Sequence, residues 1–207
     1  MRLQNIEFIH IHEDQRYSDT LPEGEEKTYV FLVAPKQSLR AEISVSLEGR
    51  NAKAQLLGII IPQRNIEVHL STTQLHKSPD SVSVCLLRSL VLNDSLVSYQ
   101  GNIFIGKRSQ GSDAFQHHDS MLLSGHARVQ TRPILEILHH AVSCKHGVSM
   151  HPIPDDVLWY AKTRLLHQKQ IERIYVDGFI RKITDMIPDS HIRDLVYNQC
   201  RNITKTL

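Results

Sequence analysis

The sequence has few of the features that mark membrane-bound and secreted proteins. No segment approaches the roughly 20 consecutive apolar residues that a helix needs to cross a bilayer. The apolar run near the start of the chain is too short for a signal peptide, and charged residues end it. The three cysteines, Cys85, Cys144 and Cys200, are too few and too scattered for a disulfide framework. These absences predict a cytoplasmic protein of a reducing compartment, with no membrane partner.

Neither sign of charge predominates. The 207 residues include 24 Lys and Arg and 22 Asp and Glu, which gives a net charge of +2, and no basic run that would follow phosphates. The phosphate-binding loops GxxxxGK(S/T) and GxGxxG are absent, as are HExxH and the class A hydrolase signatures. We therefore expect no nucleic-acid partner and no nucleotide bound by this chain.

Alternating apolar and polar residues predict strands from about residue 28 to residue 150. The alternation is clean over residues 41–48, and the apolar run at 55–61 is typical of a strand buried on both faces. Strands recur every roughly 8–12 residues without a helix between them, a pattern shared by sandwiches, barrels and β-solenoids. No exact repeat chooses among the three. Residues expected to share a face are Ala41, Ile43, Val45 and Leu47 in one strand, and Val82, Val84 and Leu86 in another.

The hydrophobic period becomes helical after residue 154. Asp155 and Asp156 stand where a helix N-terminus favours negative charge, and Asp189 or Ser190 is placed to cap a later helix. Three short helices cannot bury all their apolar stripes on one another, so some of that surface must pack on the strands or on a partner. The apolar positions are Leu158, Ala161 and Leu165 in the first helix; Ile171, Ile174, Tyr175, Phe179, Ile183 and Ile187 in the second; and Ile192, Leu195, Val196, Cys200 and Ile203 in the third.

This change of period predicts two domains, a β domain over residues 1–150 and a helical domain over residues 151–207.

Cys144 and His146 form the first candidate site. Residues two apart on a strand point the same way, so a thiol and an imidazole would lie side by side. Both are ligands for zinc or iron, yet a closed tetrahedral site needs four ligands. A buried cysteine beside a hydrogen-bonded histidine is the simpler interpretation. A Cys–His nucleophile is a further alternative, but no acidic orienting group or oxyanion motif accompanies the pair.

Other histidines form weaker candidates. His10, His12 and Glu13 resemble the metal strand of a cupin, although the glutamate follows too closely and no later strand offers the expected histidine. The adjacent pairs His117–His118 and His139–His140 should face opposite sides of a strand, so neither pair is a chelate by itself.

A series of short motifs follows in one order over roughly residues 100–183. Its residues are Gly101; Asp113-Ala114-Phe115-Gln116; Leu122-Leu123-Ser124; Ala127-Arg128-Val129; Thr131; Pro133; Leu135-Glu136-Ile137; Cys144-Lys145-His146-Gly147; Leu158-Trp159-Tyr160; Arg164; and Gly178-Phe179. This series resembles the SufD branch of the SufB/SufD family of iron–sulfur cluster assembly scaffolds. An upstream segment, residues 75–83, resembles the family's H-x-x-P-x-S-x-S strand. Gly147 favours the SufD type, because the SufB type has a glutamate after the histidine.

The resemblance implies a right-handed parallel β-helix, a β-solenoid with a small C-terminal helical domain. It implies that the helical domain binds SufC, the ABC-type ATPase of the system, with Trp159, Tyr160, Arg164, Gly178 and Phe179 as candidate contact residues.

It also implies pairing through the β-helix with a SufB-like subunit or with a second copy of the chain. Cys144 and His146 fall at the family's junction and are the candidate ligands for iron or a transient iron–sulfur cluster.

The chain departs from the family pattern in three places. Leu165 stands where a glycine is usual and Ile171 where an alanine is usual. The long helical region that commonly precedes the β-helix is almost missing, which suggests a minimal version able to pair with itself.

The leading interpretation is a non-enzymatic scaffold. The alternatives are a cupin-type metal enzyme using His10 and His12, and a structural dimerisation module in which Cys144 is buried and inactive.

Overall fold

The computed structural model describes residues 5–63 and 65–205, and within them the chain forms strands followed by helices. The ends of the two predicted domains, at 1–4 and 206–207, lie outside the described residues. The strands are β1 (Asn5–Ile11), β2 (Gln15–Leu21), β3 (Glu26–Val33), β4 (Leu39–Leu47), β5 (Lys53–Ile60), β6 (Glu67–His76), β7 (Val82–Val91), β8 (Leu96–Ile105), β9 (Asp113–Leu122), β10 (Arg128–Ile137) and β11 (Ser143–His151); the helices are α1 (Asp155–Thr163), α2 (Gln168–Thr184) and α3 (Ser190–Thr204).

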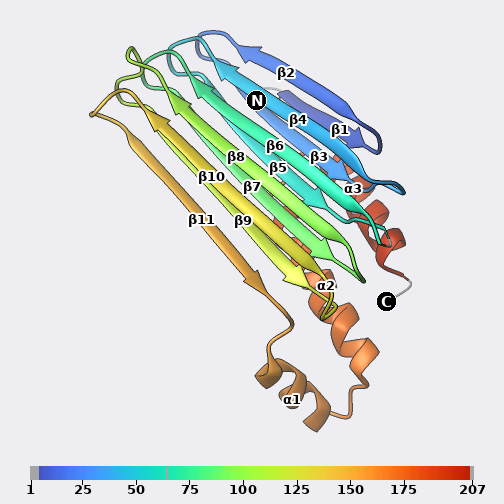
Figure 1. Cartoon of the computed structure of the whole chain (residues 1–207). Helices are drawn as coiled ribbons and strands as arrows, with labels where there is room; N and C mark the ends of the chain where they lie inside the picture. The colour runs from blue at the N-terminus through green and yellow to red at the C-terminus, as the bar shows by residue number, and fades with distance from the viewer. Residues whose placement is uncertain (1–4, 64, 206–207) are drawn as a thin grey trace.

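The chain winds as a parallel β-solenoid. The odd-numbered strands form one sheet in the order β1-β3-β5-β7-β9-β11, and the even-numbered strands form a second in the order β10-β8-β6-β4-β2. Each strand therefore pairs in parallel with the strand two along the chain, and the two sheets lie face to face (Figure 1). This confirms the predicted fold class and selects the solenoid over the sandwich and the barrel.

The strands begin earlier than the sequence pattern predicted, at residue 5 rather than about 28. The missed strand β2 is QRYSDTL, in which only Leu21 is fully buried. An end coil has a neighbour on one side alone, so its strands keep more polar residues and lose the alternation that marks an inner strand.

Most side chains inside the first coils of the solenoid are apolar. Ala41, Ile43, Val45 and Leu47 all point inward from β4 and are buried, as predicted. The apolar run of β5 is buried on both faces, because Leu57 joins a second cluster outside the sheet. That second cluster forms between the outer face of the odd-numbered sheet and the helices.

Helices α2 and α3 cover the outer face of the odd-numbered sheet, and α1 lies beyond the end of β11, packed on α2 (Figure 1). The Asp189 side chain caps α3 by accepting a hydrogen bond from the Ile192 N–H at 2.8 Å, as predicted. None of the described helices is long and apolar enough to cross a bilayer.

Several predicted stripe positions were wrong. Helix α1 ends before Leu165, and α2 ends before Ile187, although Ile187 is buried in the turn that follows. Ile174 and Leu195 lie on their helices but are exposed. The reason is that each helix contacts the sheet along a narrower stripe than the spacing of its apolar residues suggests.

The N-terminal end of the solenoid interior is closed by a polar cluster. The Lys27 ammonium lies 2.7 Å from a Glu7 oxygen and 2.5 Å from an Asp19 oxygen. The Tyr29 hydroxyl donates to Asp19 at 2.7 Å. Burial, the largest single effect, lowers the Lys27 pKa. The hydrogen bonds and charges of Asp19 and Glu7 together outweigh it, so the pKa of Lys27 is raised. A second molecule stacking on this end would have to desolvate these charges, so the cluster disfavours such stacking.

Candidate functional site

The opposite end of the solenoid is open and apolar. Strands β10 and β11 are the last members of their sheets, and no further described coil stacks on them. Their inward positions therefore face solvent, and Met150 is 50% exposed. The exposed apolar residues of this terminal coil and its loop are Ile134, Leu135, Ile137, Leu138, Val148 and Met150.

Cys144 and His146 lie together on this terminal coil, both on the inward face of β11. The Cys144 side chain packs beside Ile103, Ile105 and Ala114 and is half-buried, whereas His146 is exposed. Burial, and secondarily the nearby Asp113 carboxylate, raise the pKa of the Cys144 thiol, so the thiol is neutral at pH 7. The described residues contain no group of three or more His, Cys, Asp or Glu side chains placed to hold a metal ion.

The loop before β11 brings two more histidines near the thiol. His139 and His140 line a shallow pocket of about 570 Å³ together with Cys144. The prediction that these histidines occupy opposite faces of a strand was wrong, because they lie in the loop after β10 with their rings stacked at 4.9 Å. The prediction for the other pair is confirmed: His118 points into the solenoid and His117 points outward.

Gly147 has a steric role on β11. A Cβ at this position would lie 2.5 Å from the Cδ2 atom of His117 on the neighbouring strand. The glycine thus leaves room for an imidazole ring on the outer face of the sheet.

Polar residues fill the solenoid interior behind the terminal coil, a feature that the apolar alternation did not reveal. The Tyr99 hydroxyl bonds to the hydroxyl of Thr72 and to the Gln116 amide. His118 bonds through Nε2 to Ser89 at 2.7 Å and through Nδ1 to the Thr131 hydroxyl at 2.8 Å.

A second buried histidine, His76, bonds to the hydroxyls of Ser81 at 2.8 Å and Ser83 at 2.7 Å. Burial lowers the pKa of His76 to about 4 and that of His118 to about 3, so both imidazoles are neutral.

The strand β7 shows why these residues were missed. Val82, Val84 and Leu86 share a face, as predicted, but that face points away from the interior, and Leu86 packs with the cluster beneath the helices. The interior instead receives Ser83 and Cys85. A period of two identifies which residues share a face and does not identify which face is inside when helices cover the other.

The candidate contact residues of the helical region divide by exposure. Trp159 is 70% exposed, Tyr160 and Arg164 are exposed beside it, and the Arg164 guanidinium lies 5.3 Å from the Tyr160 ring centre. Gly178 is exposed on α2. Phe179 is buried against the sheet, under the Arg88 guanidinium at 4.4 Å. Phe179 therefore holds α2 on the solenoid and offers little surface to a partner.

Arg88 also connects the helices to the last strand. Its guanidinium donates to the Phe179 carbonyl and pairs with Asp119 at 2.9 Å. Asp119 in turn accepts from the Ser149 hydroxyl at 2.7 Å and lies 3.3 Å from His151, both on β11. One buried ion pair thus links α2, two inner strands and the terminal strand.

Leu165 adopts the backbone conformation that a glycine would favour. Its φ is +61°, in the left-handed region. The N–H groups of Leu165 and Leu166 donate to the carbonyls of Lys162 and Ala161, which is the Schellman pattern at a helix C-terminus. The turn geometry typical of glycine is therefore kept although the glycine is replaced.

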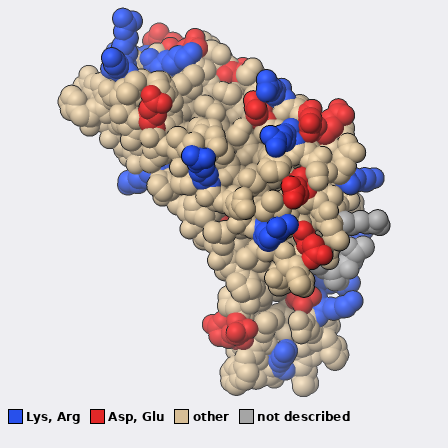
Figure 2. All heavy atoms as spheres, viewed as in Figure 1, with Lys and Arg blue, Asp and Glu red and all other residues tan. Residues whose placement is uncertain are grey.

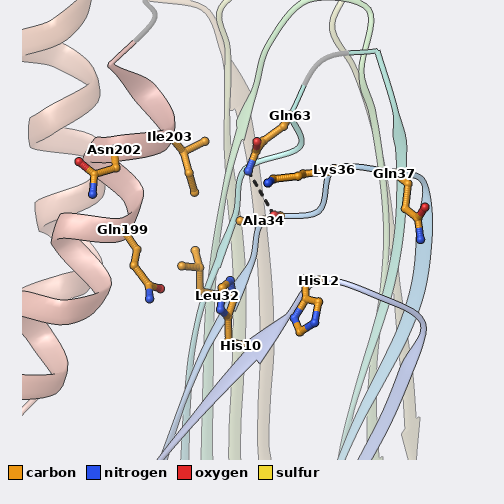
Figure 3. A pocket seen from close by; sticks show the side chains of 10 residues that line it. All are labelled: His10, His12, Leu32, Ala34, Lys36, Gln37, Gln63, Gln199, Asn202 and Ile203. Carbon is orange, nitrogen blue, oxygen red and sulfur yellow. Dashed lines mark hydrogen bonds between the residues drawn. The ribbon is translucent and has the colours of Figure 1, made fainter.

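A pocket at the N-terminal end contains the two histidines of the cupin-like motif (Figure 3). Burial, and then the neighbouring His12, lower the pKa of His10. The cupin interpretation fails on architecture, because cupins are antiparallel double-sheet jelly rolls and this chain is a parallel solenoid.

Charged groups are scattered over the face shown in Figure 2 and do not gather into a patch of one sign.

Comparisons with known proteins point to one family. The family model for the SufBD core domain of SUF-system iron–sulfur cluster assembly matches residues 25–179, more than half of the chain. The iron–sulfur cluster assembly protein SufD of Escherichia coli is 23% identical over 158 residues, which are 76% of this chain and 37% of that protein.

An iron–sulfur cluster assembly SufBD family protein of Staphylococcus epidermidis is 23% identical over 142 residues, 69% of this chain and 30% of that protein. The matches thus span about a third of each relative. The matched core domain, together with the solenoid fold, shows that this chain belongs to the SufB/SufD family of iron–sulfur cluster assembly proteins.

Proposed function

We propose that this chain is a non-enzymatic scaffold subunit for iron–sulfur cluster assembly, which pairs through its terminal coil with a SufB-like subunit or a second copy. The observation that carries the proposal is the contrast between the two solenoid ends. Lys27 and its carboxylate partners close one end, whereas the other end exposes Val148, Met150 and the free strand edges of β10 and β11. Apolar side chains beside open strand edges favour association with another sheet.

Cys144 and His146 are the proposed ligands for iron or a transient cluster at this junction. A thiolate is a soft ligand suited to iron–sulfur clusters, and an imidazole can complete a labile site. The Cys144 thiol keeps its proton at pH 7 because its pKa is raised, and metal binding would displace that proton. Two ligands from one chain leave the set incomplete, so a partner must supply the rest, and such a site releases its cluster readily.

The exposed surface of α1 and the following turn is the proposed docking site for the SUF-system ABC ATPase. Trp159, Tyr160 and Leu165 expose apolar area next to Arg164, an arrangement enriched in protein interfaces. The ATPase would bind and hydrolyse the nucleotide, and this chain would bind none.

Two pull-down experiments test the partners separately. The chain is co-expressed with the ATPase of its source organism, with Trp159→Ser/Tyr160→Ser as the test variant and Lys169→Ser, an exposed change on α2, as the control. Loss of the ATPase only in the test variant supports docking at α1. An undiminished yield with the double variant places the ATPase elsewhere.

Pairing is tested with Val148→Asp/Met150→Asp against Arg132→Asp, which lies on the outward face of β10. Light scattering after gel filtration, with and without a SufB-like subunit, should show loss of pairing in the first variant alone. Equal pairing in both variants rules out the terminal coil. Cluster loading of Cys144→Ala and His146→Ala then separates a ligand role from a purely structural one: normal loading in both favours the dimerisation module.

A further inference from the structure

A pocket of about 660 Å³ lies between the first coil and the last helix, and the assembly function makes no use of it (Figure 3). Its walls come from β1, from the segments that follow β3 and β5, and from α3. Leu32 and Ile203 supply apolar surface. The polar groups are imidazole and amide side chains, together with the Lys36 ammonium. The pocket thus joins residues from both ends of the chain.

His10 and His12 enter the pocket from the edge of the sheet. They are two residues apart, and their ring centres are 5.6 Å apart with the planes inclined at 60°. When two imidazoles bind the same ion with nitrogen–metal distances of about 2.0–2.1 Å, their ring centres lie roughly 4.5–6 Å apart. The spacing of this pair therefore suits a shared ion without movement of the backbone.

Gln199 provides a third group from α3. Its side-chain oxygen is buried and has no hydrogen-bond partner among the described residues. In Figure 3 the Gln199 side chain extends from the helix toward His10. Gln74 and Gln116, inside the solenoid, also have such an oxygen. A bound cation or an ordered water commonly satisfies a buried carbonyl oxygen of this kind.

We propose that this pocket binds one divalent transition-metal ion of the zinc, nickel or copper type through His10, His12 and the Gln199 carbonyl oxygen. Imidazole nitrogen suits these ions. None of the described residues that line the pocket is Asp, Glu or Cys, so the carboxylate cage of calcium or magnesium and the thiolates of a cluster are missing. The ion would connect β1 to α3, and so hold the first coil to the last helix.

Calorimetric titration of the chelator-stripped full chain with Zn²⁺ tests the proposal, and it needs neither the ATPase nor a paired subunit. One saturable site is expected, with affinity at least about 10-fold weaker in His10→Gln and in His12→Gln. His139→Gln/His140→Gln is the matched control, because it removes a neighbouring histidine pair at the other end of the solenoid and should leave that site unchanged.

Two further readings sharpen the result. Zn²⁺ should raise the unfolding temperature of the parent chain and of the His139/His140 control, and should not raise that of His10→Gln, because the ion links two elements that separate on unfolding. Copper bound to the parent chain should show two nitrogen ligands by electron paramagnetic resonance. A site of equal affinity in the His10→Gln and His12→Gln variants overturns the proposal, and equal affinity in Gln199→Leu overturns the third ligand.

Discussion

Mild acid should destabilise this solenoid through two interior histidines. His76 and His118 are fully buried, with pKa values lowered by burial to about 4 and about 3. An unfolded histidine has a pKa of about 6.5, so the unfolded chain binds more protons than the folded chain as the pH falls below that value. The stability that depends on the two neutral histidines is therefore fully present above about pH 6.5, and it is lost as the pH falls toward their folded-state pKa values of about 4 and about 3.

The magnitude follows from these pKa values. At pH 5 the protonation of each unfolded histidine lowers the free energy of unfolding by about 2 kcal/mol, against about 0.2 kcal/mol at pH 7. The two residues together should remove about 4 kcal/mol between pH 7 and pH 5. A chain of this size has a urea dependence near 2–3 kcal/mol per molar, so the midpoint of urea unfolding should fall by roughly 1.3–2 M.

The assay is urea unfolding followed by circular dichroism at pH 7 and pH 5. His76→Gln/His118→Gln keeps side chains that can hydrogen-bond to the surrounding serines but removes both titrating groups. Its overall stability is expected to be lower, yet its loss between the two pH values should be smaller than that of the parent chain by about 4 kcal/mol. His126→Gln, at an exposed position, is the control. Equal pH dependence in the parent and the double variant would refute the reasoning.

Three further predictions concern the turn after α1, the buried ion pair and the terminal strand. Leu165→Gly should stabilise the chain by up to about 1 kcal/mol in thermal unfolding, because it relieves a left-handed backbone at an exposed position, whereas Leu165→Ala should give no gain. Asp119→Asn should cost about 3 kcal/mol in urea unfolding, because it leaves the Arg88 guanidinium buried without a counter-ion; a loss below about 1 kcal/mol would show that the pair is dispensable. Gly147→Ala should cost about 1–2 kcal/mol, and the combination with His117→Ala should recover most of that loss if the clash with this ring is the cause.

Sequence patterns predicted local features correctly where a single physical rule determines them. Residues 41–48 alternate because a strand has a period of two, and the structure buries the predicted face. Asp189 caps α3 because its carboxylate satisfies a free N–H at the helix start. The ordered motifs around Cys144 identified the family, and the family implied a solenoid. Alternation alone could not distinguish a solenoid from a sandwich or a barrel.

Prediction failed where tertiary contacts decide the outcome. Nothing in the alternation of β7 shows that its apolar face points outward and that Ser83 and Cys85 point inward. The burial of Phe179 depends on Arg88, which is 91 residues away in the chain. The pocket of His10 and His12 depends on α3, from the opposite end of the sequence. Such juxtapositions arise from stacking of coils and docking of helices, and no local pattern encodes them.

The interior of the solenoid changes from mainly apolar to more polar toward the terminal coil, and this change bears on the proposed pairing at that end. A coil buried between neighbours gains stability from apolar side chains such as Ile43 and Leu47, whereas hydrogen-bonded groups such as Tyr99 and His118 add directional contacts that favour one register between adjacent strands. These directional contacts lie in the coils next to β10 and β11, which lack a neighbour on one side. In the proposed scaffold, a junction that presents Cys144 and His146 to a partner would need an accurate strand register more than additional burial. The polar interior lies where it would hold the terminal coil in position before such a partner binds.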